Sequence, residues 1–104
     1  MSDQAYFKII LSYDVNAERL QEYYQFVMGK YLPTVQKMGL QMIDAWSVMY
    51  GDAPGRLIGL VGEGKHAVLD LVESETWLNL NEQLTEFVTD LDYKVVPYRE
   101  GFQI

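Results

Sequence analysis

The apolar residues of this chain follow two periods in turn, and the order of these periods limits the folds that the chain can adopt. Residues 6–15 alternate along the chain, which is typical of a strand that packs one face on a core. The apolar side of this predicted strand holds Phe7, Ile9, Leu11 and Tyr13. The other side is mixed rather than polar, so we expect both faces to be at least partly covered.

Three more strands are predicted further along the chain. Residues 40–50 and 56–63 return to the period of two, and the turn-forming residues 51–55 between them predict a hairpin. A fourth strand is predicted within residues 93–104, at a sheet edge where Pro97 is tolerated because it has no amide proton to donate.

The first helix is predicted between the first two strands. Asn16 stands where an N-cap belongs, and apolar residues recur after it at steps of three and four. Pro33 would press on the carbonyl of Gly29, so we expect a kink there and an end to the helix at Gly39.

The second helix is predicted in two pieces between the third and fourth strands. Residues 65–72 have a helical pattern, and Ser74 is placed as a fresh N-cap, so the helix should bend or break near this serine. The apolar residues of the second piece are Trp77, Leu80, Leu84, Phe87 and Val88.

The assembled order is β-α-β-β-α-β, which predicts an α+β, ferredoxin-like fold with a four-stranded antiparallel sheet and both helices on one face. The 104 residues, residues 1–104, fit a single domain. Alternation puts apolar strand residues on both faces of the sheet, Ile10 among them, and leaving such a face in water is unusual for a monomer. We therefore expect a homodimer that pairs sheet to sheet.

The charge of the chain disfavours two classes of partner. The formal net charge is -7, and the eight Lys and Arg residues are scattered along the chain. Binding to nucleic acid or to an anionic membrane requires clustered basic residues, so neither partner is expected.

The chain has no cysteine, which excludes disulfides, thiol catalysis and cysteine-ligated metals. No metal site and no cofactor are predicted. The first ten residues have no signal-peptide pattern and no stretch has the length of a membrane span, so the expected location is the cytoplasm.

The order of elements, the kinked helix with Leu32-Pro33 and Lys37-Met38-Gly39, and the closing Gly101-Phe102-Gln103 resemble the dimeric α/β-barrel superfamily. This superfamily includes cofactor-free monooxygenases of the antibiotic-biosynthesis type, haem-degrading enzymes, stress-responsive barrel proteins and NIPSNAP-like proteins. The resemblance implies that two ferredoxin-like subunits pair into a barrel. The asparagine that haem degradation requires on the first strand is absent, because Asn16 follows the end of that strand.

The candidate ligand-binding residues are aromatic side chains and the single histidine. Aromatic residues between sheet and helices could orient a small apolar or aromatic molecule, although such residues more often fill a core. The candidates are Tyr13, Trp46, Tyr50, Trp77 and His66. No catalytic residue can be assigned, and two functions stay open: a homodimer that binds such a molecule, with cofactor-independent oxidative or isomerising chemistry, and a non-catalytic dimeric module with a filled core.

The sequence also predicts the surroundings of three further residues. His66 is expected to be solvated or hydrogen-bonded in the first turn of its helix. Asp44 lies mid-strand among apolar residues, so it should be either exposed or paired, with Arg56 or Arg99 as possible partners. Gly59 leaves room in its strand for a bulky neighbour, such as a ring from the helices or a ligand.

Overall fold

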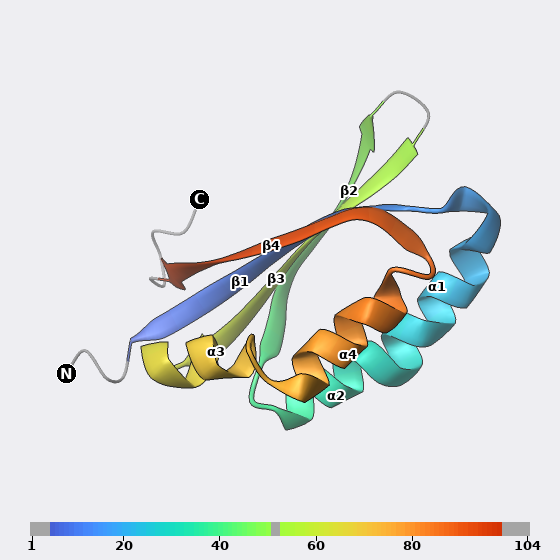
Figure 1. Ribbon diagram of the computed structural model, residues 1–104. Helices are drawn as coiled ribbons and strands as arrows, with labels where there is room; N and C mark the ends of the chain where they lie inside the picture. The colour runs from blue at the N-terminus through green and yellow to red at the C-terminus, as the bar shows by residue number, and fades with distance from the viewer. Residues whose placement is uncertain (1–4, 51–52, 99–104) are drawn as a thin grey trace.

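The computed structural model describes residues 5–50 and 53–98, without the side chains of residues 46–50 and 53–54. Its strands are β1 (Tyr6–Val15), β2 (Gln41–Tyr50), β3 (Ala53–Glu63) and β4 (Val88–Tyr98). They form one antiparallel sheet in the order β2-β3-β1-β4. The helices all lie on one side of this open sheet (Figure 1). The predicted α+β, ferredoxin-like fold is confirmed.

Strand β1 lies at the centre of the sheet, and its two faces differ. The side chains that point toward the helices form the core, and Ile9 and Leu11 are completely buried there. Their neighbours in the register, among them Leu60, Val95 and Tyr93, belong to the same core or pack against it. The opposite face is covered by no helix of the described structure (Figure 1), and we call it the open face.

The first helical region is broken where its proline predicts. It consists of a 3-10 turn (η2, Ala17–Arg19), α1 (Leu20–Phe26), a π-helical segment (η3, Val27–Tyr31) and α2 (Leu32–Lys37). The π segment, whose hydrogen bonds span one residue more than those of an α-helix, lies directly before Pro33, and Pro33 lies in the first turn of α2, where a missing amide proton is tolerated. The side chain of Asn16 accepts a hydrogen bond from the amide of Glu18, which confirms it as a cap. Gly39 follows the last turn with a φ of 101°, a conformation that favours glycine.

The second helical region consists of α3 (Lys65–Leu71) and α4 (Glu75–Leu84). The Ser74 hydroxyl accepts a hydrogen bond from the amide of Trp77, so the predicted break and its cap are confirmed. The prediction that this helix carries Phe87 and Val88 is wrong. The chain turns after Leu84, and Val88 instead begins β4, five residues before the predicted start of that strand.

Two predicted details of the hairpin also differ from the structure. Strand β3 begins at Ala53 rather than at Arg56, within the segment that was predicted as a turn. In β2 the register shifts between Met42 and Asp44. This bulge places one extra residue in the strand, so Met42 pairs with Leu60 of the core side while Asp44 pairs with Gly59. Strict alternation had put both residues on one side.

Among the described side chains, Trp77 is the largest that is completely buried, so its replacement tests how tightly the helices pack on the sheet. Trp77→Ala should lower the free energy of unfolding by about 3–5 kcal/mol, because the loss of the indole leaves a cavity. Trp77→Phe should cost less, since it fills most of the space and removes a buried N–H group that has no acceptor among the described residues. Urea denaturation of both variants gives the comparison. A loss below about 1 kcal/mol for Trp77→Ala would contradict this packing.

Candidate functional site

An ion pair lies across the centre of the open face. The Lys8 ammonium of β1 donates a hydrogen bond to Asp44 Oδ2 of β2 at 2.6 Å. To do so the lysine crosses β3, which lies between the two strands. The Lys8 side chain is only 5% exposed, whereas the Asp44 side chain is 24% exposed. Of the two alternatives predicted for Asp44, exposed or paired, the structure shows the pair. Its partner is Lys8 rather than Arg56, and Arg99 lies outside the described residues.

Gly59 makes this crossing possible. A Cβ atom at this position would lie 2.6 Å from Lys8 Cε and 3.1 Å from Asp44 Oδ2. The close approach that the sequence predicted at Gly59 is therefore confirmed, but its occupant is a lysine chain and a carboxylate. Neither is a ring from the helices, because Gly59 pairs with Ile10 and faces the open side of the sheet.

A second cluster lies on the helix side, at the end of the sheet near α1. The phenol groups of Tyr13 and Tyr23 share a hydrogen bond of 2.6 Å, and both residues are buried. Their rings meet edge to face. Arg56 of β3 donates a hydrogen bond to the Tyr24 hydroxyl and lies near the faces of both the Tyr23 and Tyr24 rings. The cluster thus runs from a buried phenol pair to an exposed tyrosine held by a cation.

Burial controls the protonation of these phenols. It raises the pKa of Tyr13 far above its usual range, and the neighbouring Tyr23 adds to this effect. Burial also raises the pKa of Tyr23, although the hydrogen bond to Tyr13 and the charge of Arg56 act in the opposite direction. Both phenols therefore stay protonated at neutral pH and act as neutral hydrogen-bonding groups.

A third polar group sits between α4 and the first helical region. The Tyr31 hydroxyl donates a hydrogen bond to Asn81 Oδ1 at 2.8 Å, and Asn81 Nδ2 donates to the carbonyl of Trp77 at 2.9 Å. Burial raises the pKa of Tyr31 as well. The Trp77 indole lies perpendicular to the ring of Tyr93, with the ring centroids 5.4 Å apart. The Tyr31–Asn81 bond thus joins the two helical regions, and the contact between Trp77 and Tyr93 joins α4 to β4.

Three of the five predicted ligand-binding residues have described side chains, Tyr13, Trp77 and His66, and these three lie in different places. Tyr13 and Trp77 both belong to the packed core, but they contact different partners, Tyr23 in one case and Tyr31 and Tyr93 in the other. The side chains of Trp46 and Tyr50 lie outside the described part of the structure. His66 is exposed in the first turn of α3, as expected, and belongs to a separate surface hollow.

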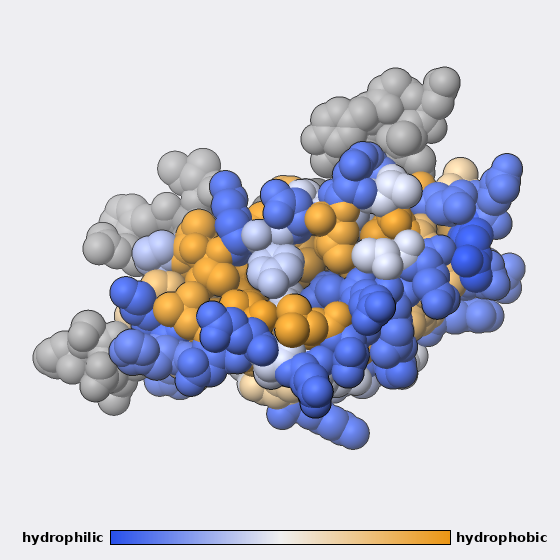
Figure 2. All heavy atoms as spheres, viewed as in Figure 1, coloured by the Kyte–Doolittle hydropathy of each residue, from blue (hydrophilic) through white to orange (hydrophobic). Residues whose placement is uncertain are grey.

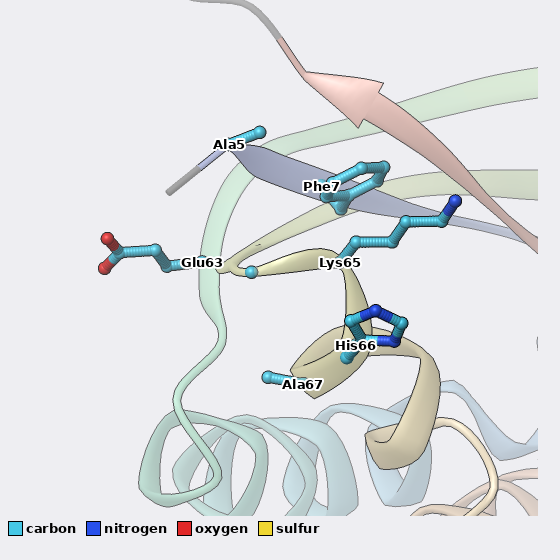
Figure 3. Close-up of a pocket in the computed structure, with 7 residues that line it drawn as sticks. Ala5, Phe7, Glu63, Lys65, His66 and Ala67 are labelled. Carbon is cyan, nitrogen blue, oxygen red and sulfur yellow. The ribbon is translucent and has the colours of Figure 1, made fainter. Parts of the chain in front are cut away.

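This hollow has a volume of about 580 Å³ and lies where the ends of β1 and β3 meet the start of α3. Figure 3 shows the Phe7 ring above the first turn of α3, with His66 on that turn and the Glu63 carboxylate pointing away from both. The residues that line it are Ala5, Phe7, Glu63, Gly64, Lys65, His66 and Ala67. A smaller hollow of about 290 Å³ adjoins it and shares Glu63 and Ala67. Both apolar and polar residues line the two hollows.

The sequence did not predict the ion pair of Lys8, the pairing of Tyr13 with Tyr23 or the contact of Arg56 with Tyr24. A signal for the ion pair was nevertheless present, because Lys8 and Ile10 alternate onto one face and Gly59 leaves a gap in the neighbouring strand. The bulge in β2 hid this arrangement, since it moves Asp44 to the open face. No sequence signal identifies which tyrosines pair, because that depends on how α1 crosses the sheet.

Within residues 5–50 and 53–98, no helix is long and apolar enough to cross a membrane. In the same residues, no three His, Cys, Asp or Glu side chains come together in an arrangement that could hold a metal ion.

Comparison with known proteins gives likenesses in structure. Neither a family model nor a curated protein matches the chain. An uncharacterized NIPSNAP domain protein from Burkholderia xenovorans superimposes with a TM-score of 0.67 at 9% identity, over 94% of this chain and 98% of that one. A NIPSNAP family protein of unknown function from Agrobacterium tumefaciens gives a TM-score of 0.64 at 10% identity, over 94% and 92% of the two chains.

A proposed antibiotic biosynthesis monooxygenase from Deinococcus radiodurans gives a TM-score of 0.65 at 13% identity, over 94% of this chain and 97% of that one. At such low identities these likenesses show that the fold is shared, and they carry no information about activity. They agree with the resemblance that the sequence suggested: the chain has the ferredoxin-like fold of NIPSNAP and monooxygenase-like proteins.

The buried tyrosines predict a loss of stability at alkaline pH. The unfolded chain loses its phenol protons near pH 10, whereas folded Tyr13, Tyr23 and Tyr31 keep theirs because their pKa values are raised. The stabilisation is therefore complete below about pH 10 and declines as the pH rises further, by about 1.4 kcal/mol per pH unit for each such tyrosine.

Urea denaturation at a series of alkaline pH values measures this slope, and the near-ultraviolet absorbance of phenolate reports ionisation. Tyr13→Phe should reduce the slope by about one tyrosine's share. Complete ionisation of all tyrosines in a protein that is still folded would contradict the buried phenol pair.

Proposed function

We propose that this chain is a homodimeric barrel protein in which two copies close their open sheet faces against each other. The observation that carries the proposal is a sheet face that no helix of the described structure covers and whose centre is apolar and nearly neutral in charge. Two-fold association of such a face with itself is the simplest closed arrangement.

The apolar residues of the open face lie side by side on the three strands β3, β1 and β4. Ile10 lies beside Lys8 along β1, and Val61 and Val96 are the cross-strand neighbours of Lys8. Leu57 lies opposite Ser12 in β3. All four apolar side chains are partly exposed in the single chain. Covering them with a second surface would remove apolar area from water at about 25 cal/mol per Å² before the entropy of association is subtracted.

The distribution of charge favours the same face. Two copies that each carry a formal charge of -7 repel each other, so a stable contact requires a region without excess negative charge. On the open face Asp14 and Glu63 belong to the two ends of the β1–β3 pairing. Between these ends, the carboxylate of Asp44 is compensated by Lys8, and Asp92 of β4 lies two residues from Lys94 on the same face.

A charge placed at the centre of the open face should prevent association. Light scattering on the purified protein at micromolar concentration should give about twice the chain mass of 12.0 kDa. Leu57→Asp should give the mass of one chain, because the cross-strand neighbour of Leu57 is Ser12 and burying an unpaired carboxylate costs several kcal/mol. Leu78→Asp is the matched control, because Leu78 is 52% exposed on α4 and should leave the dimer intact. A wild-type protein that is monomeric would rule out the barrel.

The hollow beside α3 supports a second candidate function, the binding of a small apolar or aromatic molecule. Its volume of about 580 Å³ lies within the range of small-molecule sites, and Phe7 supplies an apolar surface for such a ligand. The packing of Tyr13 and Trp77 into the core favours this hollow over their surroundings as a ligand site. If the hollow binds nothing, the remaining alternative is a non-catalytic dimeric module.

Titration with indole tests this candidate. In amide nuclear magnetic resonance spectra, the signals of residues 64–67 should shift with saturation as indole is added. Ala67→Trp should abolish the shifts by filling the hollow, because Ala67 is an exposed lining residue whose replacement leaves the core intact. Leu69→Trp on the same helix is the control, since Leu69 does not line the hollow. An absence of saturable shifts in the wild type would leave the non-catalytic module.

A further inference from the structure

The Lys8–Asp44 pair is an unusual feature to find at the centre of an apolar sheet face. Replacing a buried ion pair with apolar residues of similar size often stabilises a protein, because the charges must be taken out of water. A face that served only to fill a barrel would thus be better built from aliphatic side chains. The lysine is almost completely buried within the single chain, so most of its desolvation has occurred before any partner arrives.

Lys8 and Asp44 differ in how much of each side chain a partner surface can contact. The Lys8 ammonium lies flat on the sheet, close to the Tyr98 ring at 5.8 Å from its centroid. The Asp44 side chain keeps 24% of its surface exposed, and only its Oδ2 atom is bonded to Lys8. A surface that covers Asp44 must therefore supply a hydrogen-bond donor, or the carboxylate loses water without compensation.

We propose that the Lys8–Asp44 pair, held flat by Gly59, determines which surface the open face accepts and fixes the orientation of the second copy. This inference rests on the proposed dimer. A second copy can supply the required donor from its own open face, where Gln41 and Lys94 are exposed. An apolar surface without a donor, or a second copy placed in another orientation, leaves Asp44 uncompensated and is rejected.

Gly59 permits a test that leaves both charged residues in place. In Gly59→Ala the new methyl group overlaps Lys8 Cε, and the lysine must rise from the sheet because its flexible end is the part that can move. The dimer dissociation constant should then increase about ten-fold or more. The raised ammonium would stand out from the sheet and prevent the second copy from packing closely against the open face. Sedimentation of the variant over a range of concentrations gives this constant.

Gly62→Ala is the matched control on the same strand. A Cβ atom at Gly62 meets Leu40 and Val68 on the helix side, at 2.9 and 3.0 Å. This variant should lower the melting temperature and leave the dissociation constant within about two-fold of the wild type, because the open face is unchanged. Equal effects of the two alanines on association would overturn the proposal.

Replacing the pair itself separates affinity from orientation. Lys8→Met and Asp44→Leu should each weaken the dimer, since each leaves one charge uncompensated, whereas the double variant should associate at least as tightly as the wild type. The chain has no cysteine, so Leu78→Cys accepts a single spin label on the outer surface of α4. The distribution of distances between the two labels should be narrow with Lys8 and Asp44 present and broad in the double variant.

The outcomes distinguish this inference from the function on which it rests. A monomeric wild type would overturn both. A wild-type dimer whose affinity is unchanged by Lys8→Met and by Asp44→Leu, or whose label distances stay narrow in the double variant, would overturn the orientation role alone. The proposed homodimer would then stand without it.

Discussion

Strand β1 has neighbours on both edges, and its two faces must meet different physical demands. On one face Ile9 and Leu11 are completely buried under the helices, and this packing holds the sheet to the helical layer. On the other face no helix of the described structure covers the strand, yet Lys8 is nearly as buried as those core residues. Lys8 is buried by the residues of the open face themselves, because its side chain lies over Gly59 and its ammonium is bonded to Asp44.

Polar groups on the helix side are satisfied in a different way. Tyr13 and Tyr23 share one hydrogen bond, and Tyr31 is bonded to Asn81, so the buried hydroxyl groups have partners without any charge entering the core. Arg56, the cation beside the tyrosine cluster, stays at the exposed end of that cluster.

On the outer surface, apolar residues lie between β4 and the helices α3 and α4, while hydrophilic residues gather toward α1 (Figure 2).

Local patterns predicted most of the fold because each signal depends on neighbouring residues. Alternation gave the bounds of β1, and the serine cap gave the break between α3 and α4. The bulge at Met42 and Asp44 could not be predicted in this way, because one extra residue in a strand is decided by its pairing with β3. The ion pair depends on that bulge, so it was hidden as well. The hollow beside His66 depends on how α3 approaches the sheet, which no local pattern records.

The edges of the sheet have a consequence for how many copies can join. An unpaired edge strand is a template on which further chains can add without limit. Here β2 carries a bulge, and β4 carries Pro97, a register shift opposite Ser12 and Asp14, and Asp90 with a φ of 57°. These irregularities interrupt the row of amide and carbonyl groups that a new strand would need. Growth into fibres through the edges is therefore disfavoured, and a contact through the face would end with a finite assembly.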